Sequence, residues 1–153
     1  MMANDIFGQY IRDVERILKE EIITALIELG KEGEAVAREN HPNNWNDISG
    51  NLRSSVGYAV YEHGRIAAMS AFNVVLNGSV GAAKGTALAN SLGSQLDDAY
   101  HLTLLAAMDY AERVEALSNR DVLASAELYV RNKIEAALQM AVSKAEKRCN
   151  ALR

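Results

Sequence analysis

The spacing of apolar residues predicts a long helix at the start of the chain. Between residues 5 and 40, apolar side chains recur at steps of three and four, which places them on one face of an α-helix. They are Ile6, Tyr10, Ile11, Val14, Ile17, Leu18, Ile22, Ala25, Leu26 and Leu29. Gly30 and Gly33 follow, and each costs about 1 kcal/mol relative to Ala inside a helix. We therefore predict a kink or break there, and an end before Pro42, because the residue preceding proline avoids helical geometry.

The pattern then changes from a helical period to a period of two. Asp47 or Ser49 is placed to cap a single helical turn over residues 50–55. The next six residues alternate, with Val56, Tyr58 and Val60 on one face of a predicted strand. A tight turn over residues 62–65 leads to a second predicted strand at residues 66–76. Residues 100–108 read as a third strand, although their Leu-rich half also suits a helix.

The remainder of the chain alternates between weak and strong patterns. Residues 77–95 hold four of the ten glycines and no aromatic residue, and this composition is typical of a mobile loop or insertion. Residues 109–117 read as a short helix, and residues 121–148 as a long amphipathic helix with basic residues in its last turns. The predicted fold is one α+β domain over residues 1–153. It has a long N-terminal helix, a small antiparallel sheet with the helices on one face, a short helix and a long C-terminal helix, with a flexible insertion at about 77–95.

Composition and charge narrow the class of protein. Apolar residues make up 49% and charged residues 24% of the chain, as in an ordinary globular domain. The net charge of −4 argues against general binding to phosphate backbones. The single cysteine, Cys149, excludes an intrachain disulfide and makes a reducing compartment the default. The chain start lacks the pattern of a signal peptide, and no stretch approaches 18 apolar residues, so we expect neither secretion nor a membrane span.

For each candidate catalytic or binding residue, a structural role explains the sequence better than a chemical one. His41, Asp47 and Ser49 are the residue types of an acyl-transfer triad, but Ser49 lacks the strained nucleophile elbow, and capping accounts for Asp47 and Ser49. Residues 78–86 approach a phosphate-binding loop, yet Ala83 precedes Lys84 where that motif requires glycine. The three histidines show no metal-ligand spacing. We therefore expect a non-enzymatic protein with no cofactor, metal or small-molecule substrate, whose function is contact with other proteins.

Trp45 stands alone in the polar segment after the first helix. One interpretation is a lid that packs onto the core, and the other is an anchor for a partner subunit, since tryptophan is enriched at such contacts. The sequence leaves both open.

Two short motifs resemble a known family. The run from Ala37 to Val56 contains Ser49, Gly50, Leu52, Arg53, Ser55 and Val56, and it resembles the Thr-Gly-x-Leu-Arg-x-Ser-Ile signature of small neck or tail-completion proteins of long-tailed phages, the family named after the tenth gene product of a lambda-like phage. A second landmark of that family is matched by Tyr110, Ala111, Val114 and Glu115. The chain departs from the family in the long gap between Pro42 and Gly50 and in Ala116-Leu117, which replace an aromatic-glycine pair.

The resemblance implies a phage structural protein of the head–tail junction that acts through ring-type contacts with copies of itself and with neighbouring neck or tail proteins. It implies a place in the virion after synthesis in the bacterial cytoplasm, with no specific nucleic-acid binding and no membrane. In this interpretation Ser49 caps the turn, Gly50 permits the bend, Leu52 pins it to the core, and Arg53 points outward or pairs with a carboxylate. Trp45 and residues 77–95 are expected to become ordered at a subunit contact. The alternative is a small cytosolic regulatory or chaperone-like module that binds a partner helix along its apolar stripes.

Overall fold

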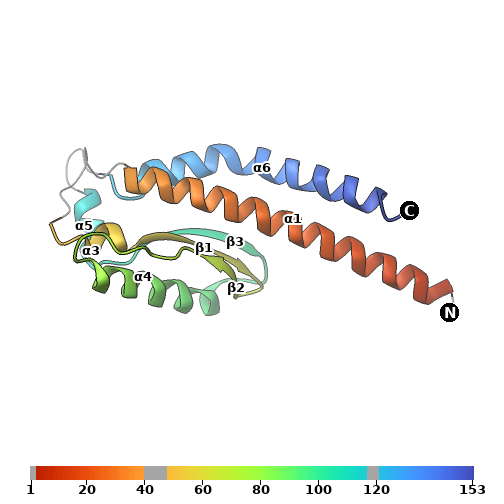
Figure 1. Cartoon of the computed structure of the whole chain (residues 1–153), viewed down its shortest axis with the longest axis horizontal. Helices are drawn as coiled ribbons and strands as arrows, with labels where there is room; N and C mark the ends of the chain where they lie inside the picture. Colours follow the sequence, from red (N-terminus) through yellow and green to blue (C-terminus); the bar gives the residue numbers. More distant parts are fainter. Residues whose placement is uncertain (1–2, 40–47, 117–120) are drawn as a thin grey trace.

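A computed structural model describes residues 3–39, 48–116 and 121–153 of the protein. Two long helices lie side by side, a three-stranded antiparallel sheet packs against them, and a further helix covers the far face of the sheet (Figure 1). The predicted α+β class and its order of elements are confirmed. In chain order the elements are α1 (Ala3–Glu39), α3 (Asn51–Ser54), β1 (Val56–Glu62), β2 (Arg65–Met69), α4 (Ser79–Leu92), the 3₁₀ turn η1 (Gly93–Gln95), β3 (Tyr100–Ala106), α5 (Ala111–Ala116) and α6 (Ala124–Asn150).

The sheet has the order β2-β1-β3, so β1 is its central strand. Strand β3 pairs with β1 along its whole length, from Val56 opposite Ala106 to Glu62 opposite Tyr100. The two faces of β1 pack against different helices, in line with the predicted alternation. Tyr58 and Val60 pack with Leu26 of α1, whereas the residues between them face α4. Because both faces are covered, β1 is buried over its first six residues.

Helix α4 corrects the prediction of a loop or flexible insertion at 77–95. Residues Ser79–Leu92 form a regular helix, and its buried positions are Gly81, Gly85 and Ala89, spaced four apart on one face. This strip of small residues lets the helix approach closely: a Cβ atom at Gly85 would lie 2.4 Å from the ring of Phe72. The Gly-Ala composition therefore serves tight packing, and the helices cover both faces of the sheet rather than one.

Helix α1 is continuous, so the predicted kink or break at Gly30 and Gly33 is also wrong. Both glycines are buried, and they mark places where the sheet and α6 come close to the α1 backbone. A Cβ atom at Gly30 would lie 2.5 Å from Cδ2 of Tyr58, and one at Gly33 would lie 2.8 Å from Cγ2 of Val130. The stability gained by packing against these neighbours outweighs the cost of placing glycine inside a helix.

Strand β2 is shorter than the predicted segment 66–76, because it ends at Met69. Beyond it Phe72 adopts a positive φ of 48°, and its buried ring joins the core between the sheet and α4. The predicted third strand, short helix and C-terminal helix are confirmed as β3, α5 and α6.

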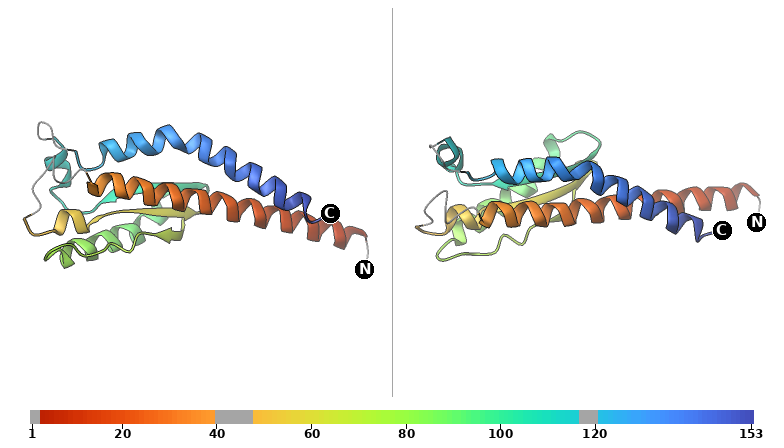
Figure 2. Two further views of the ribbon diagram at one scale, coloured as in Figure 1. Left: turned by 45° about the horizontal axis from the view of Figure 1, so that its top comes forward. Right: turned by 90° about the horizontal axis from the view of Figure 1, so that it is seen from above.

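The N-terminal part of α1 projects beyond the rest of the molecule. Helix α6 runs antiparallel to α1 and stops short of the N-terminus of α1. The two chain ends therefore lie at the same end of the molecule (Figure 2). Near that end Arg148 bridges Glu20 and Glu21 of α1 at 2.7 and 2.9 Å. We call residues 5–18 of α1 the arm; among them only Ile17 is buried.

Candidate functional site

The Ser-Gly-x-Leu-Arg segment forms a rigid corner between α1 and the sheet. The Ser49 hydroxyl accepts a hydrogen bond from the Asn51 amide at 3.3 Å, and Gly50 takes a φ of 81°, which an L-residue with a side chain rarely adopts. Leu52 is 4% exposed and belongs to a core cluster with Val56. Gly50 thus permits the bend and Leu52 lies in the core, as predicted, whereas Ser49 is not the cap of α3: the N-cap position is Gly50, and it has no side-chain cap hydrogen bond.

Side chains of the corner tie it to two distant segments. The buried Ser54 hydroxyl accepts a hydrogen bond from the Val75 amide at 2.8 Å. The amide oxygen of Asn51 accepts one from the Gly81 amide, at 3.0 Å, at the start of α4. These bonds satisfy backbone groups that would otherwise be buried without partners, and they fix the corner against α4.

Arg53 is partly buried rather than fully exposed. Its Nε atom is buried and has no hydrogen-bond partner, so the side chain is not simply directed into solvent. Within the described residues it forms no ion pair with a carboxylate. Trp45, His41 and Asp47 lie outside the described residues, so the lid or anchor interpretation of Trp45 stays a prediction.

The second motif, around α5, meets the first in one core cluster. Ala111 is buried together with Leu52, and Val114 packs against the same cluster. Glu115 has a different role: its Oε1 atom accepts hydrogen bonds from the amides of Leu123 and Ala124 at 3.2 and 2.7 Å. The carboxylate thereby satisfies free amides at the start of α6 and complements the positive end of that helix. Tyr110 is 39% exposed, at the edge of this region.

A polar network that no motif predicts joins α1 to the corner and the sheet. Glu34 accepts a hydrogen bond from the buried Ser70 hydroxyl at 2.7 Å and pairs with Arg38 at 3.0 Å. Arg38 also donates to the Val56 carbonyl at 2.9 Å. The only signal in the sequence is the four-residue spacing of Glu34 and Arg38, which is common on helices.

Large exposed apolar side chains occur in three regions of the described chain. The corner patch consists of Ile48, Leu76 and Val80, which are 93, 67 and 54% exposed and flank the contacts of α3 with α4. The arm carries Ile6, Phe7, Ile11 and Leu18, and α6 carries Leu128 and Val142, together with Met140 at the groove toward α1. Apolar patches held on rigid elements are typical of protein–protein contact surfaces.

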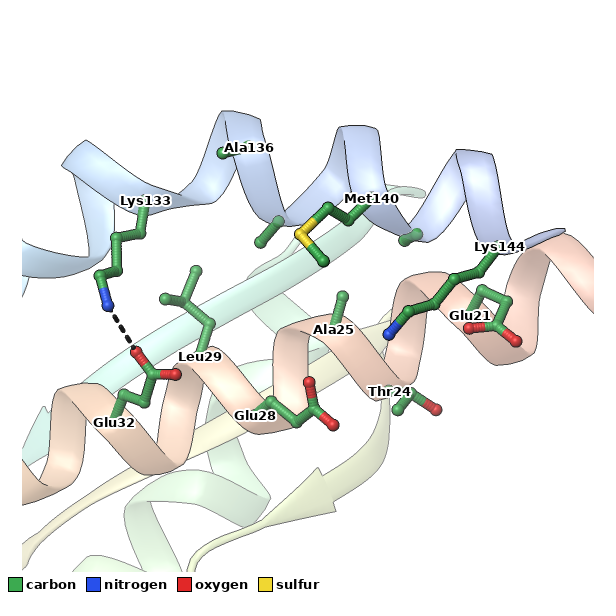
Figure 3. Close-up of a pocket in the computed structure, with 12 residues that line it drawn as sticks. Glu21, Thr24, Ala25, Glu28, Leu29, Glu32, Lys133, Ala136, Met140 and Lys144 are labelled. Atoms are coloured by element: carbon green, nitrogen blue, oxygen red, sulfur yellow. Dashed lines mark hydrogen bonds and ion pairs between the residues drawn. The ribbon is translucent and has the colours of Figure 1, made fainter. Parts of the chain in front are cut away.

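A groove of about 300 Å³ runs between α1 and α6. Figure 3 shows Met140 of α6 reaching toward Ala25 and Leu29 of α1, with charged residues along the rim. One of these, Glu32, accepts hydrogen bonds from Tyr129 at 2.7 Å and from Lys133 at 3.2 Å. The Tyr129 hydroxyl and then Lys133 lower the pKa of Glu32. A second groove, of about 310 Å³, lies between β3 and α6.

The described ionisable residues form pairs rather than a convergent site. His63 lies 2.5 Å from Asp98, and His101 lies 2.6 Å from Asp97. Lys84, in the segment that approaches a phosphate-binding loop, pairs with Asp109 at 3.0 Å on the surface. Within the parts of the chain that the structure describes, no group of three or more His, Cys, Asp or Glu residues is arranged to hold a metal ion.

The helices of the described chain include none with the length and hydrophobicity needed to cross a bilayer. Comparison of the chain with known protein families, curated proteins and solved structures finds no match.

Proposed function

We propose that the protein is a non-enzymatic assembly component that acts by binding other proteins through the exposed corner patch. The observation that carries this proposal is the corner patch. Its three aliphatic side chains stand more than half exposed beside a corner whose polar atoms are tied down by hydrogen bonds. Burying such side chains stabilises a contact by about 1.5–3 kcal/mol each, and a rigid support limits the entropy lost on binding.

We further propose that this assembly is the head–tail junction of a long-tailed phage, with the protein as a neck or tail-completion component. The support is the resemblance of the two sequence motifs to that family. In the folded chain these motifs form the corner and α5, and they share one core cluster. A shared motif with a structural role favours a shared fold, whereas the choice of partners depends on the surface around it.

The test is deletion of the gene from its phage or prophage, followed by electron microscopy and infectivity assays. We expect particles with unjoined heads and tails or incomplete tails, rescued by the wild-type gene. The double variant Leu76→Asp, Val80→Asp is expected not to rescue. Both changes suit the fold, because Leu76 has a positive φ that Asp tolerates and Val80 lies in the first turn of α4, where an acid is favourable.

The matched control is the double variant Leu128→Asp, Val142→Asp, which places the same two charges on exposed residues of α6 outside the corner patch. We expect this variant to rescue. Normal, infectious, tailed virions from the deletion strain would overturn the phage proposal, and rescue by the double variant would remove the corner patch from it.

The groove between α1 and α6 favours one alternative function, a cytosolic regulatory or chaperone-like module that binds a partner helix. Its floor is apolar and its rim is charged, which is the arrangement used for helix-in-groove recognition. Portal, capsid and tail genes beside this gene support the first proposal, whereas a metabolic or regulatory operon supports the alternative.

A further inference from the structure

The arm of α1 carries an apolar stripe that the described chain leaves largely exposed at its N-terminal end and partly covers at Val14. Phe7, Ile11, Val14 and Leu18 follow one another at steps of four, three and four, the spacing of a two-stranded coiled-coil seam. Phe7 is 67% exposed, Ile11 40% and Leu18 37%. Farther along α1 the corresponding side, at Ala25 and Leu29, faces α6, so the stripe continues a helix-packing face beyond the end of α6.

We propose that two copies of this chain pair through their arms, side by side and antiparallel. The inference concerns the free protein and goes beyond the proposed function. An antiparallel arrangement keeps the two bodies at opposite ends, whereas parallel arms bring them together at the same end. It also directs the N-terminus of each arm toward the C-terminus of the other copy's α6.

Charge favours the antiparallel arrangement. The first turn of the arm carries Asp5, the last turn of α6 carries the exposed Lys147, and the exposed Arg153 follows three residues after the end of α6. Within the described residues, none of these three forms an ion pair. The positive N-terminal end of one helix would also meet the negative C-terminal end of another, and such dipole ends attract each other.

The exposed apolar area indicates how strong the pair is. Aromatic side chains bury about 150–250 Å² each. Taking about 200 Å² as an upper figure for each fully exposed large side chain, Ile6, Phe7, Ile11, Leu18 and Leu152, at 37–67% exposure, supply at most roughly 500 Å² per copy. Two copies together reach about 1,000 Å², just below the smallest standard interfaces. The dimer is therefore weak and depends on protein concentration.

Sedimentation equilibrium of the purified chain from about 10 μM to 1 mM spans the range of such weak affinities and tests the pairing. We expect the mass to rise from one copy to two and to stop there. The double variant Phe7→Ser, Ile11→Ser removes the centre of the stripe and is expected to raise the dissociation constant at least about tenfold. Val142→Ser, an exposed apolar residue on α6, is the control and should dimerise as the wild type does.

A charge exchange tests the orientation. Asp5→Lys alone and Lys147→Glu alone are each expected to weaken the dimer about two- to fivefold, as loss of an exposed ion pair does. The combination Asp5→Lys, Lys147→Glu restores the affinity, because each copy again presents opposite charges at the contact. Circular dichroism confirms that each variant keeps its helices.

Three results would overturn the pairing: a monomer throughout the concentration range, a dimer that survives the double serine variant, or growth to a ring larger than two. Failure of the charge exchange to restore affinity would overturn the antiparallel arrangement. No virion takes part in these measurements, so their failure is distinguishable from failure of the assembly proposal.

Discussion

The two halves of α1 have similar apolar patterns but very different surroundings. In residues 20–39, which we call the core half, Leu26, Leu29 and Ala37 are 4% exposed or less. In the arm, residues 5–18, the same spacing of apolar residues leaves Phe7 and Ile6 more than half exposed. The core half of the helix therefore stabilises the fold, whereas the arm leaves apolar side chains exposed, where we propose that a second copy binds.

Amide hydrogen exchange should show the largest contrast between the halves. Opening free energies within one protein range from near zero at fraying ends up to the full free energy of unfolding. At low protein concentration we expect core-half amides to exchange only on near-global unfolding, and arm amides to exchange orders of magnitude faster. Equal protection along α1 in dilute protein would show that the arm is covered within a single chain.

Truncation of one aliphatic side chain in each half gives the next largest effect. Leu26→Ala leaves a cavity between α1 and the sheet and is expected to lower the free energy of unfolding by about 2–5 kcal/mol. Ile11→Ala removes a side chain that is 40% exposed and should change stability by less than about 0.5 kcal/mol. Urea denaturation of dilute protein measures both values. A loss of more than about 2 kcal/mol in the free energy of unfolding for Ile11→Ala would contradict the distinction between the arm and the core half.

The same substitution at two glycines should change stability in opposite directions. A Cβ atom at Gly30 meets the Tyr58 ring at 2.5 Å, so Gly30→Ala overpacks the core and is expected to cost about 1–3 kcal/mol. At Gly8 the nearest atom is the flexible Arg12 guanidinium at 3.3 Å. Gly8→Ala should therefore stabilise the arm helix, by up to about 1 kcal/mol. Thermal unfolding of the two variants with the wild type provides the comparison.

These glycines also show what could be predicted from the sequence. The spacing of apolar residues that marks a helix or a strand does not depend on which elements pack together. The long helices and the strands around β1 and β3 were therefore predictable from local pattern. Gly30, Gly33 and the glycines of α4 were not, because their role depends on what lies opposite: Tyr58, Val130 and Phe72 are distant in the chain. Composition alone reads such residues as breakers, and a spacing of four among small residues was the signal for α4.

The candidate surfaces also divide into features set by neighbouring residues and features set by residues distant in the chain. Gly50 and Leu52 act within a few residues of each other, so their roles could be predicted from the sequence. The exposure of Ile48, Leu76 and Val80 could not, since it depends on how the folded chain arranges the segments around them. Glu115 required the position of α6, to whose first amides it is hydrogen-bonded.

The smallest effect concerns charge, and it depends on pH. Hydrogen bonds from Tyr129 and Lys133 lower the pKa of Glu32 in the core half. A carboxyl with a lowered pKa in the folded state adds stability above its unfolded pKa, about 4.3. That stability disappears as the pH falls through the lowered value. Glu32→Gln should therefore cost less than about 1 kcal/mol at pH 7, because the pair is half exposed, and the deficit should shrink as the solution becomes more acidic than pH 4.

Glu15→Gln is the matched change in the arm, where the carboxylate has no ion pair within the described chain, and it should leave stability at pH 7 unchanged. If the Glu32→Gln deficit stayed constant down to pH 2, the link between α1 and α6 at this point would depend on shape rather than on charge, and the core half would owe its stability to packing alone.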